Sequence, residues 1–210
     1  MQGKIAIVIG GGQSVGSSEA VGNGWAVVTL FAREGAKVLV VDRDLASAKE
    51  TVAIISEADG EAAAVAADVV EKLQVKAAID ASMARWGRVD ILHNNVGMSV
   101  AGNDALIEEI TTEAFDCLVA VNLRGMVYSC KHVIPITHEQ RAGAIVNNSS
   151  MAAWTNYPWV GYKTTKSAII AMTQQIAIQN AAYGIRANVI LPGLMDPANG
   201  RGTRARVMRG

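Results

Sequence analysis

The chain has 210 residues, half of them hydrophobic, which is enough for one domain with a substantial buried core. Its 19 basic and 19 acidic residues give no net charge, and this balance argues against a general nucleic-acid-binding protein. No apolar run reaches the roughly 18 residues that a membrane span needs, so we expect no membrane segment and a cytoplasmic location.

Apolar runs and helical segments alternate along the chain. The expected order is strand 4–9, helix 25–34, strand 36–41, helix 45–56, strand 62–67, helix 71–86, strand 89–92, helix 112–133, strand 144–148, helix 159–183 and strand 186–191. This alternation indicates an α/β fold, a Rossmann-type doubly wound parallel sheet of about six strands with helices on both faces. We expect this domain over residues 1–195 and a basic, disordered tail over residues 196–210.

A glycine-rich loop over residues 10–24 joins the first strand to the first helix. Glycines let the backbone approach a pyrophosphate closely, and the helix N-terminus offers amide donors. Gly22 and Gly24 are the best candidates for the pyrophosphate turn. Asp42 follows Gly24 by 18 residues, close to the roughly 20 expected for an acid that binds the adenosine ribose. Such an Asp favours NAD over NADP, although Arg43 could pair with a 2′-phosphate; the alternative is a plain turn with Asp42 as a helix cap.

Tyr162 and Lys166 are four residues apart in the helix expected over residues 159–183, so their side chains share one helix face. A cation beside a phenol favours the phenolate and brings its pKa of about 10 nearer to neutral pH. Tyr162 is therefore a candidate general acid and base. The pair alone is a weak signal, because a tyrosine and a lysine at this spacing occur by chance in many helices.

Taken together, the motifs resemble those of the short-chain dehydrogenase/reductase family, over most of the chain. The loop that begins at Gly10 resembles the family's Gly-x-x-x-Gly-x-Gly in a lengthened form. The resemblance implies that Asp68 contacts the adenine, and it matches Asn94-Asn95-Val96-Gly97 to the family's Asn-Asn-Ala-Gly. There Asn94 supports the central strand, and Gly97 keeps side chains away from the cofactor. Pro192-Gly193 matches the turn that packs on the nicotinamide.

The resemblance also implies the catalytic residues. Asn122 matches the asparagine that bends its helix and holds a water. The family's Asn-x-Ser-Ser motif selects Ser150, whereas the commoner spacing of 13 residues to the tyrosine selects Ser149; we favour Ser150. The implied reaction is hydride transfer between a secondary alcohol or ketone and the nicotinamide. Tyr162 would exchange the proton, and Lys166 would lower the tyrosine pKa and bind the nicotinamide ribose.

Several features depart from the family pattern. Asn148 occupies a strand position that favours an aliphatic side chain, and an unpaired amide there would cost roughly 1–3 kcal/mol. The family's usual seventh strand is missing, so strand 186–191 should form an exposed edge that promotes association. We therefore expect a homo-oligomer, a dimer or tetramer, that acts on a small alcohol or ketone.

The alternative to an active enzyme is a non-catalytic dinucleotide-binding module or an inactive, truncated dehydrogenase. We expect no metal site, because the three histidines show no ligand spacing with Cys117 or Cys130, which are expected to be free thiols.

Overall fold

The structure, a computed structural model, describes residues 1–12, 22–99 and 102–193 of the chain. Within these ranges six parallel strands form one sheet in the order β3-β2-β1-β4-β5-β6. The strands are β1 (Ile5–Ile9), β2 (Lys37–Asp42), β3 (Ala62–Ala66), β4 (Ile91–Asn94), β5 (Gly143–Asn148) and β6 (Ile185–Ile190). The strand order reverses between β1 and β4, the switch point of a doubly wound fold. The Rossmann-type fold is confirmed, and the tail predicted for residues 196–210 lies outside the described residues.

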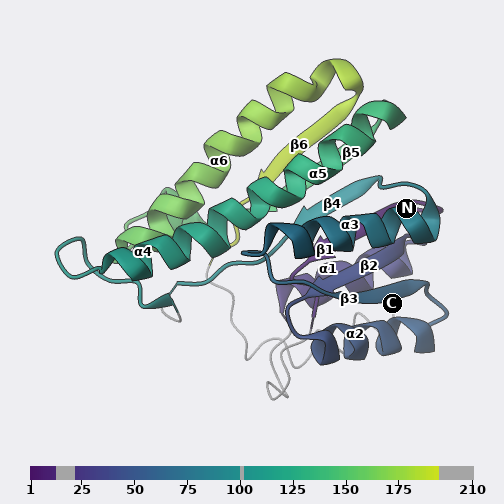
Figure 1. The fold of residues 1–210 in the computed structure, drawn as a ribbon, viewed down its shortest axis with the longest axis horizontal. Coiled ribbons are helices and arrows are strands. Elements are labelled where there is room, and N and C mark those ends of the chain that lie inside the picture. The colour runs from purple at the N-terminus through teal and green to yellow at the C-terminus, as the bar shows by residue number, and fades with distance from the viewer. Residues whose placement is uncertain (13–21, 100–101, 194–210) are drawn as a thin grey trace.

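Helices pack on both faces of this sheet (Figure 1). They are α1 (Asn23–Arg33), α2 (Leu45–Glu57), α3 (Lys72–Trp86), α4 (Thr112–Val119), α5 (Gly125–Gln140) and α6 (Val160–Asn180). Helices α1 and α2 cover one face through residues such as Val8 and Val40. Helices α3, α5 and α6 cover the other through residues such as Ile7 and Leu39. The central strands are therefore buried on both faces, as their continuous apolar runs predict.

The helix predicted over residues 112–133 is longer than expected and is interrupted. It runs through α4, a π-helical turn η2 (Ala120–Arg124) and α5, and it ends at Gln140. Pro135 lies inside α5, where it removes one backbone donor without ending the helix. Thr137 is buried, and its hydroxyl donates to the carbonyls of Val133 at 3.3 Å and Ile134 at 2.9 Å. Packing and these bonds maintain the last turn, which the sequence-based prediction missed.

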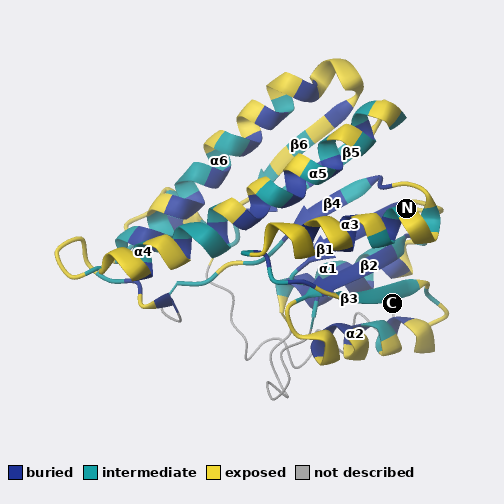
Figure 2. Cartoon of the chain, viewed as in Figure 1, coloured by how far each residue is buried: buried dark blue, intermediate teal, exposed yellow. Residues whose placement is uncertain are grey.

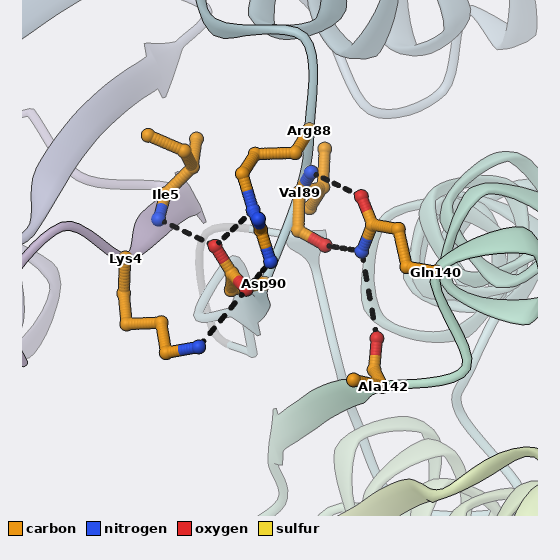
Figure 3. A network of polar contacts seen from close by, with 7 residues as sticks. All are labelled: Lys4, Ile5, Arg88, Val89, Asp90, Gln140 and Ala142. Carbon is orange, nitrogen blue, oxygen red and sulfur yellow. Dashed lines mark hydrogen bonds and ion pairs between the residues drawn. The ribbon is translucent and has the colours of Figure 1, made fainter.

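A polar network fastens the amino ends of the strands, opposite the edge at which ligands bind in this fold (Figure 3). The Asp90 carboxylate accepts from Ile5 N at 2.9 Å and from Arg88 Nη2 at 2.7 Å. Burial alone would raise the pKa of Asp90, but its bonds to Arg88 and Ile5 hold that pKa below the usual value. The Gln140 amide pairs with both backbone groups of Val89, at 3.0 and 2.7 Å. These contacts fix where β1, β4 and α5 lie relative to one another.

Strand β6 is the outermost strand of the sheet in the described part of the chain. Its residues alternate between the covered side and an exposed side (Figure 2). Arg186, Asn188 and Ile190 are on the exposed side, and Ile190 is 47% exposed. The strand is thus an edge in this region, as the sequence predicts.

Candidate active site

A cavity of about 270 Å³ opens at the carboxyl edge of the sheet. Residues that follow β4, β5 and β6 line it, together with the first turns of α1 and α6. They are Asn23, Asn95, Gly97, Asn148, Ser149, Ser150, Tyr162, Lys166, Pro192 and Gly193. Seven of the ten were given a candidate role in cofactor binding or chemistry by the sequence analysis: Gly97, Ser149, Ser150, Tyr162, Lys166, Pro192 and Gly193. They meet here because parallel strands bring their carboxyl ends to one edge.

The described part of the glycine loop is closely packed. A Cβ on Gly24 would lie 1.8 Å from the Gly10 carbonyl oxygen, and Gly10 itself has a φ of +82°. Asp42 Oδ2 accepts from Gly12 N at 3.1 Å, and a Cβ on Gly12 would lie 2.8 Å from that oxygen. Gly22, the N-cap of α1, has no side chain that could occupy the first amides of the helix, and a Cβ there would meet no other described residue within 4 Å. Residues 13–21 of the loop lie outside the described ranges.

The two carboxylates predicted for the adenosine half lie at the ends of neighbouring strands. Asp42 ends β2 and Asp68 follows β3, and both side chains are half-buried. Asp68 Oδ1 accepts from Val70 N at 3.1 Å, which holds the turn after β3 in place.

Asn94 lies beneath the cavity rather than on its wall. Its amide donates to Asn147 Oδ1 at 2.8 Å, and its oxygen accepts from the Ser129 hydroxyl at 2.7 Å. Asn147 in turn donates to the Thr173 hydroxyl at 3.0 Å. This fully buried chain connects β4, β5, α5 and α6, so Asn94 supports the strands. The next residue, Asn95, lines the cavity, and the sequence analysis gave it no role.

Asn122 lies in the π-helical turn η2 and is fully buried. Its side chain pairs with both backbone groups of Met98, accepting from N at 2.7 Å and donating to O at 2.8 Å. Its amide also lies 3.1 Å from the Thr165 hydroxyl. A Cβ on Gly97 would lie 2.8 Å from Lys166 Nζ and 3.5 Å from Asn122 Oδ1. Gly97 therefore keeps the space beside the lysine and the asparagine open.

The two serines after β5 have different surroundings. The Ser149 hydroxyl is buried and donates to the Lys166 carbonyl oxygen at 2.6 Å, which commits it to holding β5 against α6. The Ser150 hydroxyl accepts from Ala152 N at 3.1 Å, and Ser150 lines the cavity together with Tyr162. Lys163 Nζ donates to the Ala152 carbonyl at 3.1 Å, so α6 also holds the short helix η3 (Met151–Ala153) that follows Ser150.

Tyr162 and Lys166 lie on the same side of α6, with Lys166 Nζ 5.5 Å from the centre of the tyrosine ring. The ammonium donates to the Asn148 carbonyl oxygen at 2.9 Å. Burial lowers the pKa of Lys166 to about 8. Burial raises the pKa of Tyr162, and the nearby Ser150 hydroxyl opposes that shift only in part. In this arrangement the pKa of Tyr162 therefore lies above its usual value, opposite to the expected lowering by Lys166, and burial is the main cause.

Asp104 has a place in the site that the sequence analysis missed. Its buried carboxylate accepts from Gly161 N at 2.8 Å and from Tyr162 N at 2.7 Å. Helix α6 has no cap from its own N-cap residue, Trp159. A carboxylate 58 residues earlier in the chain therefore caps the helix and fixes the backbone at Tyr162. No local pattern could have indicated a contact over that separation.

The described residues do not contain a group of three or more His, Cys, Asp and Glu side chains arranged to hold a metal ion. Cys117 and Cys130 are both free, and burial raises the pKa of the Cys130 thiol to about 12. Of the described helices, none is both long and apolar enough to cross a membrane.

Comparison with known proteins identifies the family. A family model described as Enoyl-(Acyl carrier protein) reductase matches residues 16–208. An uncharacterized oxidoreductase of Thermotoga maritima is 35% identical over 193 residues, 91% of this chain and 72% of the relative. The chain belongs to the short-chain dehydrogenase/reductase family.

Two further matches support this membership. The 2-(R)-hydroxypropyl-CoM dehydrogenase of Xanthobacter autotrophicus is 34% identical over 83% of this chain and 71% of its own length. The crystal structure of NAD⁺-bound xylitol dehydrogenase matches 98% of this chain and 76% of its own, with a TM-score of 0.85 and 29% identity. Short-chain dehydrogenases/reductases act on CH–OH groups with a nicotinamide dinucleotide cofactor.

The residues at the carboxyl edge fit such a cofactor. Gly24 lets helix α1 approach the Gly10 backbone closely, and Gly97 leaves space beside Lys166 that a Cβ would fill. Lys166, whose ammonium is buried, and Asn148, whose buried Oδ1 has no partner among the described residues, line the same cavity. These are the groups that can bind hydroxyl and amide groups of a ligand.

Proposed function

We propose that this short-chain dehydrogenase/reductase interconverts a secondary alcohol and a ketone by hydride transfer, with Tyr162, Lys166, Ser150 and Asn122 as its catalytic group. The observation that carries the proposal is that Tyr162, Ser150 and Lys166 line one cavity, with Lys166 Nζ 5.5 Å from the centre of the Tyr162 ring. When bound, the dinucleotide supplies the ring that gives or accepts the hydride.

In this proposal Tyr162 exchanges a proton with the substrate oxygen. Its raised pKa keeps the phenol protonated near pH 7, so in the reduction direction it acts as the proton donor. Ser150 donates its hydroxyl to the same oxygen and orients it. Lys166, whose pKa of about 8 leaves it charged at pH 7, holds a ribose hydroxyl and replaces the proton that the tyrosine gives up. Asn122 holds the water that connects Lys166 with solvent.

We infer a preference for NAD over NADP from Asp42. A carboxylate at the end of β2 accepts hydrogen bonds from ribose hydroxyls and repels a 2′-phosphate. Arg43 is exposed and is the residue that could oppose this preference. We expect NADH to bind at least about tenfold more tightly than NADPH, and Asp42→Asn to reduce that ratio. Equal affinities in the wild-type protein would contradict the inference.

An aromatic cluster adjoins Tyr162. Tyr157 lies 5.3 Å from the ring of Tyr162 and 5.5 Å from the ring of Trp159, centre to centre, and its hydroxyl is 3.0 Å from that of Ser99. Trp154 is 71% exposed near this cluster in the sequence. These side chains favour a substrate with an apolar or aromatic body.

The deciding experiment compares Tyr162→Phe with the wild-type protein. NADH affinity is measured by fluorescence titration, and turnover by absorbance of NADH with a panel of alcohols and ketones. We expect Tyr162→Phe to abolish turnover and to leave NADH binding nearly unchanged. Turnover that survives would exclude Tyr162 as the proton donor. NADH binding without turnover in the wild-type protein would support the second candidate, a non-catalytic dinucleotide-binding module.

The homo-oligomer and the cytoplasmic location stay predictions. Apolar side chains at the β6 end of the molecule favour association, since Ile178 is 74% exposed and Ile190 is 47% exposed. Light scattering at tens of micromolar protein tests the first prediction, and a monodisperse monomer would contradict it.

A further inference from the structure

Asn148 presents an unsatisfied acceptor inside the candidate active site. It is the last residue of β5 and only 6% exposed. Its amide nitrogen donates to Asn95 Oδ1 at 2.5 Å, whereas its own Oδ1 is buried and has no partner among the described residues. A buried acceptor without a donor destabilises a fold, so this oxygen needs an explanation.

The orientation of the Asn148 amide follows from its neighbours. Asn95 Nδ2 donates to the Gly10 carbonyl oxygen at 3.0 Å, which can only accept. Asn95 must therefore turn its Oδ1 toward Asn148, and Asn148 must donate its Nδ2–H to that oxygen. Exchanging the nitrogen and oxygen of Asn148 would set two acceptors against each other. The free atom of Asn148 is accordingly an acceptor, assigned from the hydrogen-bond network.

The surroundings of this oxygen suggest what it binds. Asn148 lines the cavity together with Lys166, and its backbone carbonyl accepts from Lys166 Nζ at 2.9 Å. Strand β5 lies three strands from β2, which carries Asp42, or about 14 Å at the usual strand spacing. A dinucleotide whose adenosine ribose lies at Asp42 therefore reaches β5 with its nicotinamide half.

We propose that Asn148 Oδ1 accepts a hydrogen bond from the nicotinamide half of the bound dinucleotide, from a ribose hydroxyl or the carboxamide N–H. The inference rests on the proposed function and adds a cofactor-binding residue to it. An aliphatic side chain at this position could not make the bond. Asn148 then binds two groups: its backbone carbonyl accepts from the Lys166 ammonium, and its side chain accepts from the cofactor.

The test measures dissociation constants of purified variants by fluorescence titration for NADH and by calorimetry for ADP, which lacks the nicotinamide half. Asn148→Leu keeps the branched shape of the side chain and removes its acceptor. We expect it to weaken NADH binding roughly three- to tenfold and to leave ADP binding unchanged. Asn148→Ala removes the same acceptor without the bulk, and it provides the measurement if the Leu variant does not fold.

Asn95→Ala is the matched control, because it breaks the same side-chain pair from the other end. Asn95 holds the glycine loop through Gly10, so this variant should weaken NADH and ADP binding alike. The proposal is overturned if Asn148→Leu binds NADH as the wild-type protein does, or if it weakens ADP binding as much as NADH binding. A wild-type protein that binds neither NADH nor NADPH would instead refute the proposed function.

A cofactor analogue identifies the donor. In 3-acetylpyridine adenine dinucleotide the carboxamide is an acetyl group and has no N–H. If the Asn148→Leu effect persists with the reduced analogue, the donor is a ribose hydroxyl. If the effect vanishes with the analogue and is present with NADH, the donor is the carboxamide. Either result supports the proposal.

Discussion

Replacing Asp104 with alanine should weaken the fold and the site together. The carboxylate caps α6 by accepting from Gly161 N at 2.8 Å and Tyr162 N at 2.7 Å. It also accepts from Ala105 N at 3.1 Å and from the Ser99 hydroxyl at 3.3 Å. Asp104→Ala removes all four bonds and leaves the first amides of α6 without a partner in a buried region.

The magnitude follows from the two bonds to α6. Loss of a helix cap costs about 0.5–2 kcal/mol, and a buried bond to a charged group is worth about 1.5–3 kcal/mol. Because water can reach part of the site in the variant, we expect a loss of about 2–4 kcal/mol in the free energy of unfolding. Asp104→Asn keeps one acceptor oxygen but turns its NH₂ group toward a backbone N–H, so we expect about half that loss.

Urea unfolding at pH 7, with the slope m unchanged, measures this loss. Asp44→Ala is the matched control, because Asp44 also caps a helix: its carboxylate accepts an exposed hydrogen bond of 2.9 Å from Ala46 N at the start of α2. It should cost about 1 kcal/mol and leave turnover unchanged. If Asp104→Ala costs no more than this control, or leaves kcat unchanged, the assigned role of Asp104 in holding the Tyr162 backbone is wrong.

Three further predictions concern Ser150, Lys166 and His93. Ser150→Ala should lower kcat by about 100-fold or more, because the loss of one stabilising donor typically costs about 10²–10³-fold. Ser149→Ala should mainly lower the unfolding temperature. Steady-state kinetics and thermal melts compare the two variants, and the reverse result would reassign the catalytic serine. Lys166→Met should abolish turnover yet raise the free energy of unfolding at pH 7 by about 1–2 kcal/mol, because it removes a buried charge. The folded protein loses the Lys166 proton near pH 8, and the unfolded chain loses it near pH 10.5, so the stability of the wild-type protein should rise between these two pH values. The stability advantage of Lys166→Met over the wild-type protein should shrink across the same window, as urea titrations at several pH values can verify. Burial lowers the pKa of His93 to about 4, so its neutral form contributes stability that is fully present above pH 6.5 and is lost, by up to about 3 kcal/mol, as pH falls toward 4. His93→Leu should remove that part of the pH dependence, and an unchanged profile would contradict the assignment.

Much of the fold could be predicted from local patterns. Continuous apolar runs buried on both faces, each followed by a helix, specify a parallel sheet, and β1 to β6 lie within two residues of their predicted positions. Helix ends were predicted less well where packing outweighs local preference. Pro135 indicates a helix end in the sequence, but the buried Thr137 and its hydrogen bonds carry α5 on to Gln140.

Some features of the candidate site could also be predicted from the sequence, and others could not. The sequence by itself determined which residues gather at one edge of the sheet, because the carboxyl ends of parallel strands must meet there. It also determined that Tyr162 and Lys166 share a helix face, since that depends only on their spacing of four residues. These statements depend on periodicity and strand order, which are local properties of the chain.

Only the tertiary structure decided how individual polar groups are used. It decided that Ser149 bonds to a backbone carbonyl while Ser150 lines the cavity with Tyr162, that Asp104 caps α6, and that Asn148 Oδ1 has no partner among the described residues. It also reversed the expected pKa shift of Tyr162, because burial acts on the phenol more strongly than the nearby Ser150 hydroxyl does. Hydrogen bonds and desolvation depend on contacts between segments tens of residues apart, and no local pattern encodes them.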